Sequence, residues 1–322
     1  MQKLTNYIQG FWIKFHILKA LKGLIRRRNY TSVCIGSLDA LGWLVGWLRH
    51  VKVVIYVHGE EVSQEAYSKR AEARRRKALQ SADGIIAVSH FTADLIAKKY
   101  GVDPEKIEVV TNGVDLSRFE EKPTENVRTQ FGLGHGPLVL AVGRLVPRKG
   151  FDKLLEAWPR VLASVPEAQL AIGGTGPLGE QLAAEARQPE MGESVHMLGF
   201  VPDEVMPSLY ASADLFAMPN RTMPDGDTEG FGLVFLEAAA AGTPSIAGNA
   251  GGAVDAVLDG ETGRLVDGED VSAIAYAITD LLTDEVTRKR MGEAARKHAL
   301  TQGWPDKAQQ ILAFLDRLEK AD

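Results

Sequence analysis

Two glutamates, Glu229 and Glu237, enclose the segment of this sequence whose residue types and spacing most clearly predict chemistry. An apolar run (215–219) and a polar loop precede Glu229, and a stretch rich in alanine follows and ends at Gly242. The pattern predicts a strand, a loop and a helix whose first turn is 230–233. Unpaired N–H groups at a helix N-terminus favour a phosphate, and a carboxylate can accept hydrogen bonds from both hydroxyls of a ribose. The segment therefore predicts a nucleotide site, with a capping acid and a surface glutamate as the plainer alternative.

Two cations, Arg144 and Lys149, lie between another apolar run (137–144) and the next helical pattern (151–165). Arginine can bind a diphosphate through its planar fork, and lysine binds it as a point charge. Ordinary surface cations are the alternative, but a cation at a helix N-terminus is unfavourable unless an anion lies nearby. A third turn of this kind, 173–177, is rich in glycine and is equally well explained as a plain tight turn.

Short apolar runs alternate with amphipathic helical patterns along nearly the whole chain. Continuous apolar runs are typical of strands that are covered on both faces, as in a parallel sheet. The predicted strands span residues 33–36, 51–57, 84–89, 107–111, 137–144, 168–173, 195–199, 215–219, 244–247 and 263–266. The alternation predicts an α/β fold in which the cations and glycine turns follow the carboxyl ends of the strands, where open sheets bind ligands.

The length of 322 residues favours two domains. The polar and glycine-rich segment 118–137 is predicted to link a first domain (1–133) to a second (134–303), and a last helix (304–322) is expected to pack back on the first domain. Hydrophobic residues make up 45% of the chain and charged residues 25%, which excludes a disordered or fibrous protein. A single cysteine, Cys34, excludes a disulfide scaffold.

Charge is distributed unevenly along the chain. Residues 1–77 carry 15 Lys and Arg against 5 Asp and Glu, whereas the whole chain has a net charge of −5. The N-terminal part should therefore attract an anionic partner such as a membrane surface, and a helix packed on a sheet explains its apolar face (13–24) equally well. The sequence contains no run of about 18 apolar residues, so a membrane-spanning helix is not expected. The basic run 74–77 is unaccompanied by any recognisable nucleic-acid-binding module, so no nucleic-acid partner is expected.

His58 directly follows the predicted strand 51–57 and precedes a glycine and two acids. A histidine in this position is a candidate site residue, although a lone histidine is more often structural. The spacing does not match a zinc-binding helix, because no second histidine lies four residues further on.

Taken together, the segments 144–149, 173–177 and 229–237 resemble retaining family 4 glycosyltransferases of GT-B fold, over about residues 30–320. Within that family the segments 144–150 and 216–219 resemble bacterial phosphatidylinositol-mannoside mannosyltransferases. The same motifs occur in exopolysaccharide and lipopolysaccharide transferases, so the acceptor stays open. The resemblance implies two Rossmann-like parallel-sheet domains that face a cleft, with the donor in the second domain and the acceptor on the side of the first.

The resemblance also implies roles for individual residues. Arg144 and Lys149 would hold the donor diphosphate, Glu237 the ribose, and Glu229 the hydroxyls of the donor sugar. His58 would face the sugar and the acceptor. The backbone groups implied in donor binding are those of Gly174, Phe200, Val201, Gly230, Phe231, Gly232 and Leu233. The donor is expected to be a GDP- or UDP-linked hexose, transferred with retention by front-face attack and without a cofactor or a metal, although 225–227 has the spacing of a metal motif.

The sequence departs from the family at its start, where a basic helix stands in place of the usual first strand and glycine-rich loop. A shortened first domain is therefore expected: the chain is a naturally short form, or it lacks its true start, or a partner supplies the rest. A hexosyltransferase acting on a lipid-linked or envelope glycan, peripherally at the inner face of the cytoplasmic membrane, is the main interpretation. A donor-binding or scaffold subunit that needs a protein partner is the alternative, a homodimer stays open, and a phosphorylase or an epimerase is a third interpretation. The family turn 112–115 is present, preceded by Thr111 instead of the usual proline.

Overall fold

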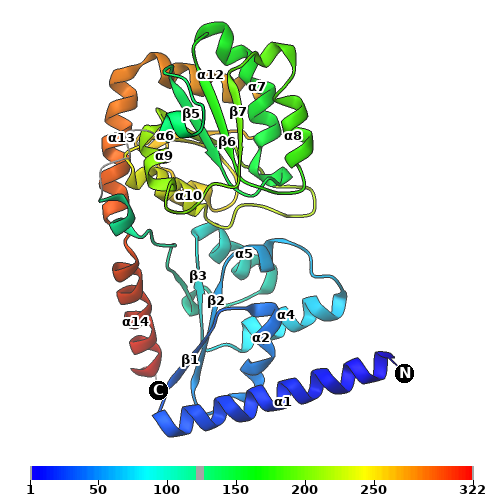
Figure 1. Cartoon of the computed structure of the whole chain (residues 1–322). Helices are drawn as coiled ribbons and strands as arrows, with labels where there is room; N and C mark the ends of the chain where they lie inside the picture. Colours follow the sequence, from blue (N-terminus) through cyan, green and yellow to red (C-terminus); the bar gives the residue numbers. More distant parts are fainter. Residues whose placement is uncertain (1, 121–126, 321–322) are drawn as a thin grey trace. The chain divides into compact units, whose positions relative to one another are not determined.

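The computed structural model of the chain describes residues 2–120 and 127–320, and it describes side chains from residue 12 onward (Figure 1). The chain forms two compact units. Unit 1 contains Met1–Val88, Thr92–Val110 and Gln310–Asp322, and unit 2 contains Ser89–Phe91 and Thr111–Gln309. The sequence predicted boundaries at 133/134 and 303/304. The chain instead leaves unit 1 after Val110, because the segment from Thr111 on bonds to residues of unit 2, as in the 2.9 Å hydrogen bond from the Val114 N–H to the Gln302 carbonyl.

Unit 1 is built on a parallel sheet of four strands in the order β1-β2-β3-β4. The strands are β1 (Ser32–Ile35), β2 (Lys52–Val57), β3 (Gly84–Ala87) and β4 (Ile107–Val109). The α-helices are α1 (Gln2–Arg28), α2 (Leu38–Leu41), α3 (Glu60–Ser63), α4 (Lys69–Ser81) and α5 (His90–Tyr100). Helices α2 and α4 cover one face of the sheet, and α14 (Trp304–Lys320) covers the other (Figure 1).

The last helix joins the core of unit 1 through its C-terminal half. Phe314 is buried against Val54, Ile86 and Val110. Arg317 pairs with Glu108 at 2.6 Å at the edge of the same face. Residues 310–320 therefore form an integral layer of unit 1.

Helix α1 lies on unit 1 through one stripe of its surface. Leu18, Leu21 and Ile25 pack against the core, whereas Ile13 and Ile17 remain exposed to solvent. The C-terminal part of α1 is thus a packed helix, and the apolar side chains within 12–17 are exposed to solvent. Within the described residues, none of the helices combines the length and the apolar character that crossing a bilayer requires.

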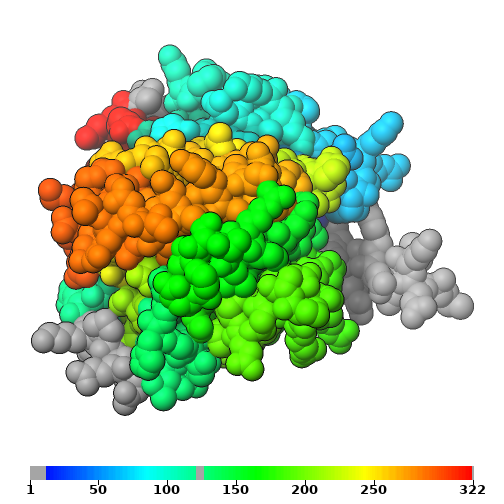
Figure 2. All heavy atoms as spheres, turned by 90° about the horizontal axis from the view of Figure 1, so that it is seen from above, coloured from blue at the N-terminus to red at the C-terminus, as the bar shows by residue number. Residues whose placement is uncertain are grey.

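Unit 2 contains a parallel sheet of six strands in the order β10-β9-β8-β5-β6-β7. The strands are β5 (Leu138–Val142), β6 (Gln169–Gly173), β7 (Val195–Gly199), β8 (Leu215–Met218), β9 (Ser245–Gly248) and β10 (Gly263–Val266). The α-helices are α6 (Val127–Gln130), α7 (Phe151–Ser164), α8 (Gly179–Glu185), α9 (Met206–Ser212), α10 (Leu233–Ala240), α11 (Ala253–Ala256), α12 (Val271–Thr283) and α13 (Glu285–Leu300). Figure 2 shows the face on which α12, in orange, lies against α7, in green.

The order of the strands in unit 2 reverses between β5 and β8. The chain proceeds from β5 outward to β6 and β7, and then returns to the other side of β5 with β8. In open α/β sheets, ligands bind outside the carboxyl ends of the strands at such a reversal. The loops that follow β5 and β8 therefore occupy the place where a ligand site is expected.

All ten strands predicted from apolar runs are present, with ends that differ by at most two residues. Strands β8 and β9 are buried along their whole length, which explains why their sequences are continuously apolar. The predicted α/β fold with parallel sheets is confirmed.

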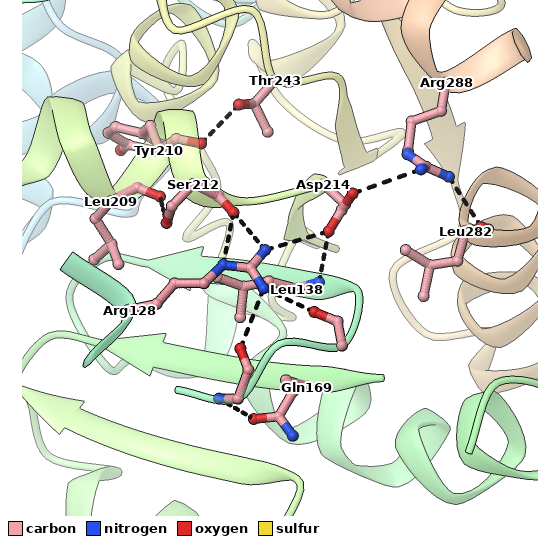
Figure 3. A network of polar contacts seen from close by, with 12 residues as sticks. Arg128, Leu138, Gln169, Leu209, Tyr210, Ser212, Asp214, Thr243, Leu282 and Arg288 are labelled. Carbon is pink, nitrogen blue, oxygen red and sulfur yellow. Dashed lines mark hydrogen bonds and ion pairs between the residues drawn. The ribbon is translucent and has the colours of Figure 1, made fainter. Parts of the chain in front are cut away.

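Residues 127–137 of the predicted linker are built into unit 2 by Arg128 (Figure 3). The guanidinium donates to the carbonyls of Ser212 at 2.6 Å, Gly136 at 2.8 Å and Gly134 at 3.2 Å. It also pairs with Asp214, which accepts a hydrogen bond from the Leu138 N–H at 2.8 Å and pairs with Arg288. Residues 121–126 of the predicted linker lie outside the described residues.

We expect Arg128→Ala to destabilise unit 2 by about 3 kcal/mol, because three carbonyls and Asp214 lose a charged donor. Thermal unfolding would report this as a lower Tm. Arg187→Ala, at an exposed arginine of the same unit, is the matched control and should change stability by less than about 0.5 kcal/mol. Equal stability of the two variants would show that the network does not hold 127–137 in place.

Candidate functional site

The loops that follow β5, β6 and β7 are bonded to one another through their backbones. The Gly143 N–H donates to Gly173 at 3.0 Å, the Leu145 N–H to Thr175 at 2.9 Å, and the Gly174 N–H to Gly199 at 2.7 Å. Gly174 has a φ of +134°, and a Cβ atom there would lie 1.9 Å from the Gly143 carbonyl oxygen. Only glycine fits this position. The sequence did not distinguish a ligand-binding turn from a plain tight turn at 173–177, and the structure shows that this turn packs against the end of β5.

Lys149 and Glu229 meet between the loop after β5 and the loop after β8. The Lys149 Nζ lies 2.5 Å from the Glu229 Oε2, and the two side chains are 11% and 12% exposed. Arg144 lies on the same loop as Lys149 and is exposed. An ammonium has three N–H donors, so Lys149 can bond to Glu229 and still donate to a bound anion.

Ion pairs and an asparagine hold the long loop between β8 and α10. Arg148 pairs with Asp227 at 3.2 Å, and Arg221 pairs with Asp152 at 2.8 Å. Asn220 is fully buried; its amide donates to the Ala250 carbonyl and accepts from the Gly248 N–H. Asp227 of the metal-like 225–227 motif is therefore engaged by an arginine. Among the described residues there is no cluster of three or more His, Cys, Asp and Glu side chains suited to a metal ion.

The start of α10 differs from the prediction. The sequence predicted that 230–233 forms the first helical turn, but α10 begins at Leu233 and Gly230, Phe231 and Gly232 precede it. Gly232 has a φ of +91°, and this left-handed conformation prevents α10 from starting earlier in the chain. A Cβ atom at this position would lie 2.6 Å from the Phe235 ring. The loop is fixed by the Gly252 N–H, which donates to the Glu229 carbonyl at 2.7 Å.

Glu237 is held on α10 by side chains from two other elements. The Tyr210 hydroxyl on α9 donates to the Glu237 Oε2 at 3.0 Å, and the Arg118 Nη1 lies 3.7 Å from the Oε1. Burial raises the pKa of the Glu237 carboxyl, and both Tyr210 and Arg118 oppose that rise. The alternative of a simple surface glutamate is excluded, because this side chain is only 18% exposed.

Neither Tyr210 nor Arg118 was singled out from the sequence. Arg118 belongs to the short 3-10 helix Leu116–Phe119, which follows the family turn 112–115 and is capped by Asp115. That turn was the only sequence signal that pointed to this region. The unusual Thr111 before the turn also has a structural role, because its hydroxyl accepts a hydrogen bond from the buried Lys307 at 2.7 Å.

Phe200 and Val201 follow β7 directly. Phe200 is 75% exposed, whereas Val201 is buried close to Gly173. Gly199, with a φ of +65°, turns the chain at this point and accepts the hydrogen bond from Gly174. The backbone of 200–201 therefore lies next to the Gly174 turn.

His58 is the one predicted site residue that belongs to unit 1, whereas all the others belong to unit 2. It is exposed at the end of β2, and its ring lies 4.7 Å from the Tyr56 ring. Its backbone N–H donates to the Glu61 carboxylate at 2.8 Å, and Gly59 begins the next turn with a φ of +106°.

The chain matches two protein-family models. The model described as "Glycosyl transferases group 1" matches residues 124–298, and the model described as "Glycosyltransferase Family 4" matches residues 5–118. Together they cover most of both units.

Curated relatives share about a third of their residues with the chain. A GDP-mannose-dependent alpha-(1-6)-phosphatidylinositol monomannoside mannosyltransferase of Mycolicibacterium smegmatis is 39% identical over 290 residues, which cover 88% of this chain and 75% of the relative. A D-inositol 3-phosphate glycosyltransferase of Corynebacterium efficiens is 32% identical over 302 residues, which cover 88% and 69%.

Solved structures share the fold. HepE of Anabaena in complex with UDP matches with a TM-score of 0.80 and 24% identity, over 92% of this chain and 81% of HepE. A sucrose-phosphate synthase from Thermosynechococcus elongatus matches with a TM-score of 0.77 and 26% identity, over 95% and 78%. The two parallel-sheet units are thus of GT-B type, and the chain belongs to the group 1 (family 4) glycosyltransferases, enzymes that use nucleotide-sugar donors.

Proposed function

We propose that this glycosyltransferase transfers mannose from GDP-mannose to a phosphatidylinositol-mannoside type of lipid. The observation that carries the proposal is the pairing of Lys149 with Glu229 where the strand order of unit 2 reverses, with Arg144 on the same loop and Glu237 on α10. Relatives that are 35% to 39% identical and are named as GDP-mannose-dependent mannosyltransferases acting on such lipids support the choice of sugar, nucleotide and acceptor.

In the proposed complex, each part of the donor has its own group of residues. Arg144 and Lys149 bind the diphosphate, assisted by the backbone N–H groups of 230–233. The backbone of Gly174, whose N–H donates to the Gly199 carbonyl, lines the proposed site. The base lies against the backbone of 200–201. Glu237 accepts hydrogen bonds from the ribose hydroxyls, and the carboxylate of Glu229 accepts them from the mannose.

The proposed reaction retains the configuration at the anomeric carbon. The acceptor hydroxyl attacks from the face on which the diphosphate leaves, so the new C–O bond forms as the bond to the β-phosphate breaks. A β-phosphate oxygen takes the proton of the acceptor hydroxyl. Arg144 and Lys149 stabilise the negative charge that develops on the leaving GDP, a role that a metal ion has in other transferases. We therefore propose a reaction without metal or cofactor, and we propose that His58 contacts the acceptor.

We also propose that the enzyme works peripherally at the inner face of the cytoplasmic membrane, where its lipid acceptor lies. Residues 1–77 carry an excess of ten positive charges. On α1 the aromatic side chains of Trp12 and Phe15 are exposed, as are Lys19, Lys22 and Arg26. Exposed aromatic and basic side chains on one helix favour an anionic lipid surface.

Calorimetry of GDP, UDP and ADP without metal tests the donor site. We expect GDP to bind, and we expect Lys149→Ala to weaken its affinity by about 10- to 100-fold, because a charge-assisted hydrogen bond to phosphate is lost. Lys297→Ala, at an exposed lysine of unit 2, is the matched control. Thermal unfolding must accompany the comparison, because the Lys149 variant leaves Glu229 buried without its partner. Binding that is insensitive to Lys149 in a folded variant would contradict the proposed site.

Transfer from radiolabelled GDP-mannose to purified phosphatidylinositol mannosides tests the reaction. The expected product is a lipid with one further mannose, and its anomeric proton in NMR should show the α configuration of the donor. An inverted product would contradict retention. Nucleotide binding without transfer to any acceptor would instead favour a donor-binding subunit.

Co-sedimentation with vesicles tests the membrane contact. Binding to vesicles that contain phosphatidylinositol is expected at low salt and should weaken as salt screens the charges. Changing Lys19, Lys22 and Arg26 to glutamine should weaken binding by roughly 100-fold, since each basic residue near an anionic surface contributes about 1 kcal/mol. The matched control changes Arg187, Arg296 and Lys297 of unit 2 to glutamine. Absence of binding at low salt would refute the membrane contact.

A further inference from the structure

The carboxylate of Glu237 is approached from two directions by elements that the implied family roles do not include. The Tyr210 hydroxyl of α9 donates to one oxygen at 3.0 Å. The Arg118 guanidinium of the 3-10 helix Leu116–Phe119 lies 3.7 Å from the other oxygen. Asp203 is the further charged group that faces this carboxylate, and its negative charge favours protonation of Glu237.

Tyr210 is built into the core of unit 2 as a fixed donor. Its side chain is fully buried, with the ring 5.6 Å from the Phe216 ring and 6.5 Å from the Phe119 ring. Its backbone carbonyl accepts a hydrogen bond from the Thr243 hydroxyl at 2.7 Å (Figure 3). Burial raises the pKa of Tyr210 well above its ordinary value, so its hydroxyl keeps its proton throughout the working range of pH.

Arg118 is held where it can act on the same carboxylate. Its Nη2 donates to the Asp203 carbonyl at 2.8 Å, and Asp115 caps the helix on which it lies through the Ser117 N–H. The 3-10 helix that follows the family turn 112–115 thereby places the Arg118 guanidinium beside Glu237 on α10.

We propose that Tyr210 and Arg118 are positioning residues that keep Glu237 ionised and turned toward the ribose of the donor. The proposal rests on the proposed function of Glu237 as the ribose ligand. A protonated glutamic acid offers one acceptor fewer than a carboxylate, so the two ribose hydroxyls bind best when burial does not protonate the group. Tyr210 supplies the larger effect, because it is fully buried, whereas Arg118 is a third exposed and its attraction is screened by solvent and salt.

The first test follows the Glu237 carboxyl in the free protein by NMR of carbon-13-labelled glutamate. Tyr210→Phe keeps the ring in place and removes only the hydroxyl. We expect this variant to raise the pKa of Glu237 further, and Arg118→Gln to raise it less and mainly at low salt. Tyr276→Phe, at an exposed tyrosine of unit 2, is the matched control. An unchanged pKa in the folded Tyr210 variant would overturn the proposal.

The second test compares the binding of GDP with that of 2′,3′-dideoxy-GDP, which has the same diphosphate but no ribose hydroxyls. Tyr210→Phe should weaken GDP by roughly 5- to 20-fold and leave the dideoxy nucleotide unchanged. As pH falls, GDP binding should be lost at a higher pH in this variant than in the wild type, because Glu237 is protonated earlier. Equal weakening of both nucleotides, or an unmoved pH profile, would show a merely structural role and overturn the proposal.

The two tests separate this inference from the proposed function. The ratio of the affinities for GDP and for the dideoxy nucleotide is compared between the wild type and Glu237→Ala. If the two proteins have the same ratio, Glu237 does not bind the ribose, and Tyr210 then does not position a ribose ligand. The NMR titration needs no nucleotide, so it still decides whether Tyr210 and Arg118 control the charge of Glu237.

Discussion

The reversal of strand order between β5 and β8 is the constraint on which the candidate site of unit 2 depends. Because the chain leaves β5 on one side and returns on the other, the loops after these two strands come together at one edge of the sheet. Lys149 and Glu229 are 80 residues apart in sequence and pair at this edge. The backbone bonds among the ends of β5, β6 and β7 extend the same edge to Gly174 and Gly199. No single segment contains the site, and the topology assembles it.

Charge compensation then fixes the geometry of the loops. Lys149 pairs with Glu229, Arg148 with Asp227, and Arg221 with Asp152, and in each pair the basic side chain is about nine-tenths buried. Such pairs contribute little net stability compared with apolar side chains, but removal of one partner is costly because the other charge stays buried. Their effect is therefore to select one loop conformation. The three pairs hold the segment between β8 and α10 in one arrangement around the predicted donor residues.

The sequence contained the strands and the charged side chains but not the contacts between them. Continuous apolar runs located all ten predicted strands, because a strand that is buried on both faces needs apolar residues at successive positions. The start of α10 was missed because the left-handed Gly232 looks like any other glycine in a sequence. Tyr210 was missed because it lies in an apolar segment, where an aromatic residue predicts only packing. The role of 127–137 was missed because the hydrogen bonds of Arg128 go to backbone carbonyls, which no side-chain pattern encodes.

The Lys149–Glu229 pair has a consequence for how a donor is recognised in the proposed function. A lysine without a partner would attract any phosphate, but here a carboxylate 2.5 Å away cancels part of that attraction. An incoming diphosphate gains the charge of Lys149 and also meets the negative charge of Glu229. A sugar attached to the diphosphate relieves that repulsion, because its hydroxyls donate hydrogen bonds to Glu229. In the proposed function, recognition of the phosphate is thus coupled to recognition of the sugar through one ion pair, and this coupling would favour an intact nucleotide sugar over inorganic phosphate at the same site.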